Sequence, residues 1–147
     1  MKISTRTRYG LRLLTSLASE YGNKPVFLKD IAAGEEISEK YLSLIVIPLR
    51  GTGLITSVRG AHGGYCLARA PKLINLRQVM EAMEGEICLV DCVKYPLSCS
   101  RSAGCPTHDV WNILNARIKS TMNNITLADL IKKKCPAPKA RRKRKTL

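Results

Sequence analysis

The sequence contains few aromatic residues and few acidic ones. One of its 147 residues is tryptophan and one is phenylalanine, so a core must be built mainly from aliphatic side chains. Only 11 residues are acidic against 25 lysines and arginines, which gives a net charge of +14. Hydrophobic residues still make up 45% of the chain, as in folded domains. The excess positive charge says little about the fold, but it favours polyanionic partners.

No stretch of the chain approaches the roughly 20 apolar residues needed to span a bilayer. The longest apolar stretch, residues 41–49, is interrupted by Ser43 and Pro48. Arg6 and Arg8 lie where a signal peptide would need its apolar segment. We therefore expect a cytoplasmic protein without membrane contact, in which the six cysteines are reduced. Metal binding or thiol chemistry is then a better interpretation of the cysteines than a disulfide framework.

The sequence also lacks the motifs of common catalytic sites. It contains no nucleophile elbow, no phosphate-binding loop and no pair of carboxylates suited to acid–base work. We therefore do not expect an enzyme.

The positive charge is concentrated at the C-terminus. Residues 132–147 contain nine of the basic residues and no acidic one, which leaves 16 basic against 11 acidic residues, or +5, in residues 1–131. The proline-, lysine- and arginine-rich composition predicts a disordered tail. Such a tail binds nucleic acid without sequence preference, so one alternative is a nonspecific architectural protein driven by its tail.

Two short helices predict a helix-turn-helix after a first helix over residues 5–21. Apolar residues recur at helical spacing over residues 28–33, and Gly34 follows where a helix end favours a residue with positive φ. Ser38 is a good N-cap for the second helix, which should reach about Arg50.

A β-hairpin follows this helix pair directly. Residues 54–58 and 65–68 have the composition of strands, and a glycine-rich tip joins them. The hairpin would be the wing of a winged helix-turn-helix. The predicted fold class is mainly α: a winged helix-turn-helix with a small β-hairpin wing in residues 1–85, which a helix from Asn75 to Gly85 completes.

The remainder divides into a cysteine-bearing loop and a long helix. Residues 86–106 show no helical period, so we interpret them as a loop. Pro106 suits the first turn of a helix, and residues 107–131 should hold a dimerisation helix and a short terminal helix. Apolar residues on more than one side of the long helix indicate packing against a second copy.

A recognition helix places its first residues against base edges in the major groove, and a wing tip can enter the minor groove. Basic residues near the N-terminus would contact phosphates without specifying sequence. The candidate DNA contacts are Lys2, Arg6, Arg8, Ser38, Glu39, Lys40, Tyr41, Ser43, Arg59, Gly60, His62 and Gly63.

Three cysteines and one histidine form a candidate metal site. Cys92, Cys99, Cys105 and His108 have the spacing C-x6-C-x5-C-x2-H. Thiolates suit iron–sulfur clusters or zinc, but the paired C-x2-C knuckles of structural zinc sites are missing. An iron–sulfur cluster, zinc and unliganded thiols therefore all remain open, with Cys88 as a reserve ligand.

The combination resembles the Rrf-type winged-helix transcription regulators. The resemblance covers about residues 1–131 and rests on MKISTRTRYGLRLL, LKDIAAGEEISEKYLSLIVIPLRGTGLI, VRGAHGGYCLARAP, LRQVMEAMEG and the three cysteines that follow. It implies a homodimer that binds a double-stranded DNA operator. Trp111, Leu114 and Ile118 would lie on the helix that crosses the partner.

The resemblance also implies a 2Fe–2S cluster held by Cys92, Cys99 and Cys105. The fourth ligand differs among members: in some it is a histidine that His108 matches, and in others an acidic residue where this chain has Arg8. The sequence is therefore most similar to the family's iron–sulfur cluster regulator. The implied function is a repressor that senses cluster status and controls cluster-biogenesis genes. The alternative is a zinc- or thiol-based DNA-binding regulator without a cluster.

Overall fold

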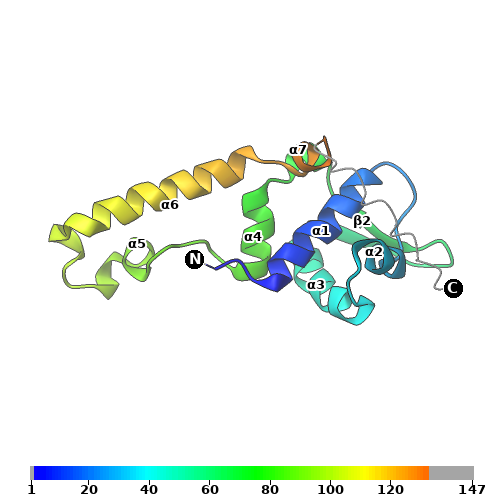
Figure 1. The fold of residues 1–147 in the computed structure, drawn as a ribbon, viewed down its shortest axis with the longest axis horizontal. Coiled ribbons are helices and arrows are strands. Elements are labelled where there is room, and N and C mark those ends of the chain that lie inside the picture. Colours follow the sequence, from blue (N-terminus) through cyan, green and yellow to red (C-terminus); the bar gives the residue numbers. More distant parts are fainter. Residues whose placement is uncertain (1, 133–147) are drawn as a thin grey trace, which may run out of the picture.

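The computed structural model describes residues 2–132, so the predicted tail lies outside the described residues except for Lys132. Seven α-helices and two strands are found in this range. In chain order they are α1 (Thr5–Ser19), α2 (Leu28–Glu35), α3 (Glu39–Gly51), β1 (Ile55–Val58), β2 (Gly64–Leu67), α4 (Leu76–Glu84), α5 (Asp91–Lys94), α6 (Pro106–Asn124) and α7 (Leu127–Lys132). The mainly α fold with a two-stranded wing is confirmed (Figure 1). No helix among residues 2–132 has the length and apolarity to cross a membrane.

The core of the body is aliphatic, as the scarcity of aromatic residues predicts. It lies where α1, α3 and α4 meet, with α2, α7 and the wing strands around it (Figure 1). Its largest fully buried side chains are those of Leu13, Leu14, Leu17, Leu42, Ile45, Leu49, Leu54, Ile55, Ile74, Val79 and Leu127.

The turn between α2 and α3 differs from the sequence prediction. Gly34 lies inside the last turn of α2, and the residue with positive φ is Glu36, at 54°. The amide of Ile37 donates to the carbonyl of Ala32 at 3.0 Å, and the Ile37 side chain is buried. This arrangement ends helices and pairs a hydrogen bond with an apolar contact. The burial of Ile37 therefore sets the end of α2, although glycine would adopt the left-handed conformation more easily.

The predicted N-cap of α3 is confirmed. The hydroxyl of Ser38 accepts a hydrogen bond from the amide of Tyr41 at 3.4 Å. Because the cap fixes where α3 begins, it also fixes which residues lie in the first turn of the recognition helix.

The wing is tied to the connection between α1 and α2. β1 and β2 pair antiparallel, with Val58 opposite Gly64. In that connection Val26 forms a single antiparallel bridge with Tyr65, and the two residues exchange backbone hydrogen bonds of 3.0 and 2.8 Å. Gly64 has φ +139°, and a Cβ there would lie 2.5 Å from the carbonyl oxygen of Val26. The bridge therefore requires glycine at position 64.

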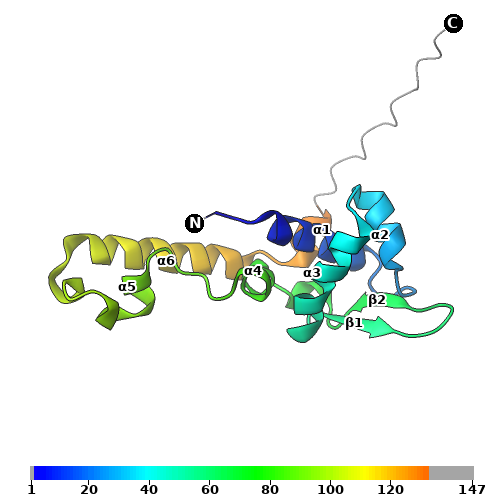
Figure 2. The ribbon, with the colours of Figure 1, turned by 90° about the horizontal axis from the view of Figure 1, so that it is seen from below.

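Helix α6 projects from the body and carries the cysteine segment at its far end (Figures 1 and 2). A small apolar cluster of Met80, Ile87 and Met122 joins α6 to α4. The segment predicted as a loop in fact contains α5 and two short 3-10 turns, Pro96–Ser98 and Ser102–Gly104. Helices this short leave little periodicity in a sequence.

Candidate functional site

The first residues of α3 are exposed, as a recognition helix requires. Ser38, Glu39, Lys40 and Ser43 all face solvent. Two of their hydroxyl groups also bond to the helix itself. Ser38 caps the helix, and the Ser43 hydroxyl donates to the carbonyl of Lys40 at 2.7 Å. Glu39 and Lys40 are therefore the residues of this turn whose side chains are most available to a ligand.

The side chain of Tyr41 in α3 packs against α1. Its ring packs edge-to-face on that of Tyr9, with the centroids 5.8 Å apart. The Arg12 guanidinium lies 5.6 Å from the centroid of the Tyr9 ring. Tyr41 is half-buried and lines a surface hollow together with Arg6. The structure thus brings two predicted DNA contacts, Arg6 and Tyr41, side by side.

At the wing tip, three of the four predicted contacts are accessible and one is not. Arg59, Gly60 and His62 are exposed, whereas Gly63 is buried. The Gly63 amide donates to the carbonyl of Gly60 at 3.0 Å. A Cβ at Gly63 would lie 2.3 Å from the carbonyl oxygen of Val58. Gly63 therefore closes the tip and presents little surface to a ligand.

The basic residues at the start of α1 are exposed. Lys2 precedes the helix, and Arg6 and Arg8 lie in its first turn. The Arg8 guanidinium donates to the Thr5 hydroxyl at 2.9 Å. All three cations are available to phosphate groups.

Glu84 links the end of α4 to this cationic start of α1. Its carboxylate accepts hydrogen bonds from the amide of Ser4 at 3.0 Å and from the hydroxyl of Thr7, which is buried. Hydrogen bonds from the Ser4 and Thr7 side chains hold the pKa of Glu84 below its ordinary value of 4.5. No local sequence pattern reveals this contact, because the partners are 77 and 80 residues apart.

The cysteine segment places Cys92 beside His108. The imidazole Nε2 of His108 lies 3.2 Å from the carbonyl oxygen of Cys92, and Nδ1 lies 3.2 Å from the side-chain Nδ2 of Asn112. Cys92 belongs to α5 and His108 to the first turn of α6, so the packing of these helices sets the contact.

Cys105 is the N-cap residue of α6, and its thiol is surrounded by hydrogen-bond donors. Its Sγ lies 3.1 Å from the hydroxyl of Thr107. The Thr107 hydroxyl, followed by the backbone amides of Thr107 and His108, lowers the pKa of Cys105 below its ordinary value of 9.0. A helix N-terminus favours a thiolate in the same way.

The donor chemistry fits a soft metal centre, but the donors are not gathered into a preformed site. Cys66, Cys88, Cys92, Cys99 and Cys105 are all free thiols, and Cys135 lies outside the described residues. Within residues 2–132, no three histidine, cysteine or acidic side chains lie close enough to hold a metal ion. Three thiols and an imidazole suit iron–sulfur chemistry, provided that the segment rearranges around the group.

The outer face of α6 carries a row of exposed apolar side chains. Trp111 and Leu114 are 38% and 42% exposed, and Val110 and Ile113 beside them are more so. Ile118 differs, because it packs on the apolar cluster between α4 and α6 of its own chain. Two of the three residues assigned to the dimer helix are thus free for a partner.

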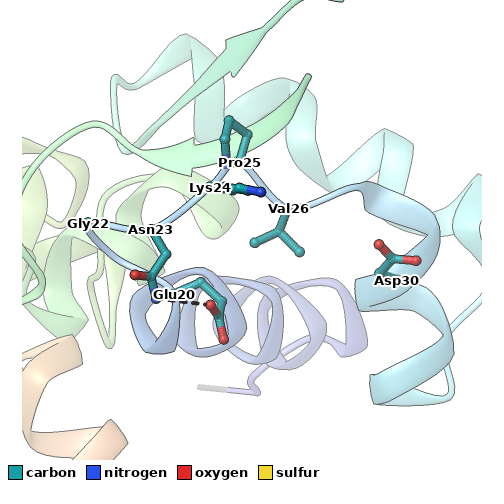
Figure 3. Close-up of a pocket in the computed structure, with 7 residues that line it drawn as sticks. All are labelled: Glu20, Gly22, Asn23, Lys24, Pro25, Val26 and Asp30. Atoms are coloured by element: carbon teal, nitrogen blue, oxygen red, sulfur yellow. Dashed lines mark hydrogen bonds between the residues drawn. The ribbon is translucent and has the colours of Figure 1, made fainter. Parts of the chain in front are cut away.

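A separate open hollow lies at the connection between α1 and α2 (Figure 3). Polar and apolar side chains line it in similar measure, and within it the Asn23 side-chain amide donates to the carboxylate of Glu20 at 3.2 Å. Lys24 and Asp30 also line it. None of the predicted site residues lies there.

The family described as Rrf2, an iron-dependent transcriptional regulator, matches residues 3–133. The protein Rrf2 of Nitratidesulfovibrio vulgaris is 40% identical over 139 residues, which are 95% of this chain and 93% of that protein. CymR, described as the global cysteine regulator of B. subtilis, has a solved structure with a TM-score of 0.78 and 34% identity, covering 92% of this chain and 99% of CymR. The structure of T. potens IscR has a TM-score of 0.72 and 36% identity, covering 90% and 87%.

Proposed function

The chain belongs to the Rrf2 family of transcriptional regulators, which are not enzymes, and from that premise we propose a dimeric repressor that binds operator DNA and senses iron–sulfur cluster status. One observation supports the DNA-binding part above all others. The chain presents an exposed first turn of α3 and an exposed wing tip, and both carry basic side chains.

The two exposed elements suit different grooves. Glu39 and Lys40 can contact base edges in the major groove, where each base pair presents a distinct pattern of donors and acceptors. Arg59 at the wing tip can enter a narrow minor groove, where the negative potential is strongest. Lys2 and Arg6 would hold phosphates and set the register.

A second copy would cover the exposed face of α6. Val110, Trp111, Ile113 and Leu114 are too apolar and too close together for a solvent-facing helix. A pair of chains joined there would carry two recognition helices, and the operator would be a pseudo-palindrome with half-sites about one helical turn, or a multiple of it, apart.

Cys92, Cys99, Cys105 and His108 would hold a 2Fe–2S cluster. When bound, the cluster would supply a redox-active centre whose occupancy depends on iron and sulfide supply. The family's description as iron-dependent supports this assignment. We propose that the regulated genes are those for cluster biogenesis.

The chain offers a route from the cysteine segment to the DNA-binding body. The carboxylate of Glu86 lies 3.1 Å from Lys94 of α5 and 3.6 Å from Lys119 of α6. Gly85 ends α4 with φ +81°, and Glu84 before it contacts the start of α1. A change in the segment can thus alter α4 and α1. The cluster can shift DNA affinity only if it binds more tightly to one arrangement of the cysteine segment and body than to the other.

The test compares the DNA affinity of protein purified without oxygen with that of its Cys92→Ala variant. We expect the two to differ on at least one operator, and identical affinities on every operator would refute sensing. A visible spectrum with iron and sulfide counts tests the cofactor directly. Colourless, iron-free protein after reconstitution would refute the cluster and leave DNA binding untouched.

The second candidate is a thiol-based regulator without a cluster. The lowered pKa of Cys105 and the absence of an assembled ligand set within residues 2–132 favour it. CymR, described as the global cysteine regulator of B. subtilis, shares this fold. Zinc is the other alternative. A zinc site gives no visible absorption, unlike a cluster, and metal analysis identifies the bound zinc directly.

The basic tail should add affinity without specificity. Removal of residues 132–147 takes away nine positive charges. We expect weaker binding and a smaller dependence on salt, with unchanged sequence preference. Loss of the preference along with the tail would favour a nonspecific architectural protein instead.

A further inference from the structure

Two large aliphatic side chains lie on the solvent face of α3. The exposed fractions of Leu44 and Ile47 are 53% and 61%. The buried stripe of the helix consists of Leu42, Ile45, Val46 and Leu49. At 100° per residue, Leu44 and Ile47 lie on the side opposite that stripe, in line with Lys40 one turn earlier.

The surroundings of this pair are cationic. Single exposed apolar residues are normal on protein surfaces, but these two are neighbours and both line a hollow of about 350 Å³. Arg6 of α1 lines the same hollow, and Lys40 and Arg50 of α3 are exposed. Leu44 and Ile47 thus form an apolar strip bordered by positive charge. Such a strip is complementary to a DNA groove that has apolar groups on its floor and phosphates along both edges.

We propose that Leu44 and Ile47 contact the C5-methyl groups of thymines in the major groove, so that the half-site contains thymine opposite this face of α3. The proposal rests on the proposed DNA-binding function and adds the base that the helix prefers. Thymine alone carries a methyl group on its major-groove edge. Leu44 and Ile47 offer no hydrogen bonds, so a cytosine amino group placed against them would lose its water without gaining a partner.

The experiment begins with an operator selected from random duplexes by the full-length protein. Each thymine of the half-site is then replaced by deoxyuridine, which removes only the methyl group. We expect affinity to fall about fourfold for each methyl group contacted, the value for burying one such group. Leu44→Ala and Ile47→Ala should bind thymine DNA more weakly, and the double variant should no longer distinguish thymine from deoxyuridine.

The matched control is Leu73→Ala, because Leu73 is 58% exposed but lies outside α3 and the wing. It should keep the wild-type preference for thymine. Both substituted α3 residues are exposed, so far-UV circular dichroism and melting curves should match the wild type. Equal binding of thymine and deoxyuridine operators by the wild type would overturn the proposal while specific DNA binding stands. Failure to select any sequence would instead count against the proposed function.

Discussion

Replacement of Glu84 tests whether α4 and the start of α1 are mechanically linked. The Glu84 carboxylate accepts from the Ser4 amide and the Thr7 hydroxyl, and Gly85 after it leads into the cysteine segment. We expect Glu84→Ala to lower the stability of the protein and to weaken DNA binding through Lys2 and Arg6.

The magnitude follows from the partners that lose their acceptor. Hydrogen bonds to charged groups contribute about 1.5–3 kcal/mol, and solvent exposure of Glu84 reduces that contribution. Thr7 is only 1% exposed, but the Ser4 hydroxyl at 3.2 Å can replace part of its bonding. We therefore expect Glu84→Ala to lower the free energy of unfolding by about 1–2 kcal/mol. Glu84→Gln keeps an acceptor oxygen and should lose less than Glu84→Ala.

The effect should depend on pH in a definite direction. Because hydrogen bonds lower the pKa of Glu84 in the folded protein, its charge stabilises the fold fully above the ordinary value of 4.5. That stabilisation is lost as the pH falls through the folded-state pKa. The difference between wild type and Glu84→Gln should thus be constant near neutral pH and shrink in acid.

Urea unfolding followed by far-UV circular dichroism at several pH values measures both effects, and fluorescence anisotropy measures DNA affinity. The matched control is Glu81→Ala on the same helix, which removes only the i,i+4 ion pair with Arg77. That change should cost about 0.5 kcal/mol or less. Wild-type stability in Glu84→Ala, or a difference that grows in acid, would refute the reasoning.

Three further predictions follow from single contacts. Gly64→Ala should cost more than about 2 kcal/mol in thermal melts, because its Cβ would meet backbone, whereas Gly22→Ala, with no atom within 4 Å, should cost less; equal losses would contradict the steric argument. The alkylation rate of Cys105 against pH, followed by mass spectrometry, should show a pKa below 9.0 that rises in Thr107→Val; an unshifted profile would disprove the role of the hydroxyl. Ile113→Asp should convert dimers to monomers in light scattering, because Ile113 is 60% exposed on the proposed interface; an unchanged mass would argue against that interface.

Local sequence rules predicted most element boundaries. Ser38 caps α3, Asn75 forms a capping box with Gln78 at the start of α4, and Pro106 opens α6. Each of these signals acts within three residues, so the sequence contains the information in one place. The wing could be predicted for the same reason, since its glycine-rich tip directly follows a strand.

Features that depend on distant contacts could not be predicted. The left-handed residue is Glu36 rather than Gly34, because burial of Ile37 decides where α2 ends. The sequence pattern places Gly63 among the candidate DNA contacts and does not reveal that the backbone of the tip encloses it. Glu84 has no partner nearby in the sequence, so nothing local revealed its contact with α1. The candidate metal ligands follow from spacing alone, and their arrangement in a loaded protein stays a prediction.

The bridge between Val26 and Tyr65 has a consequence for how such a regulator could adapt to different promoters. It fastens the turn end of strand β2 to the same body that holds α3, so the wing and α3 of one subunit keep a fixed separation. Adaptation to a new spacing between operator half-sites cannot then occur by reorienting the wing relative to α3. In the proposed dimer it would require a change in the angle at which the two subunits meet, and the sequence of α6 would set that angle.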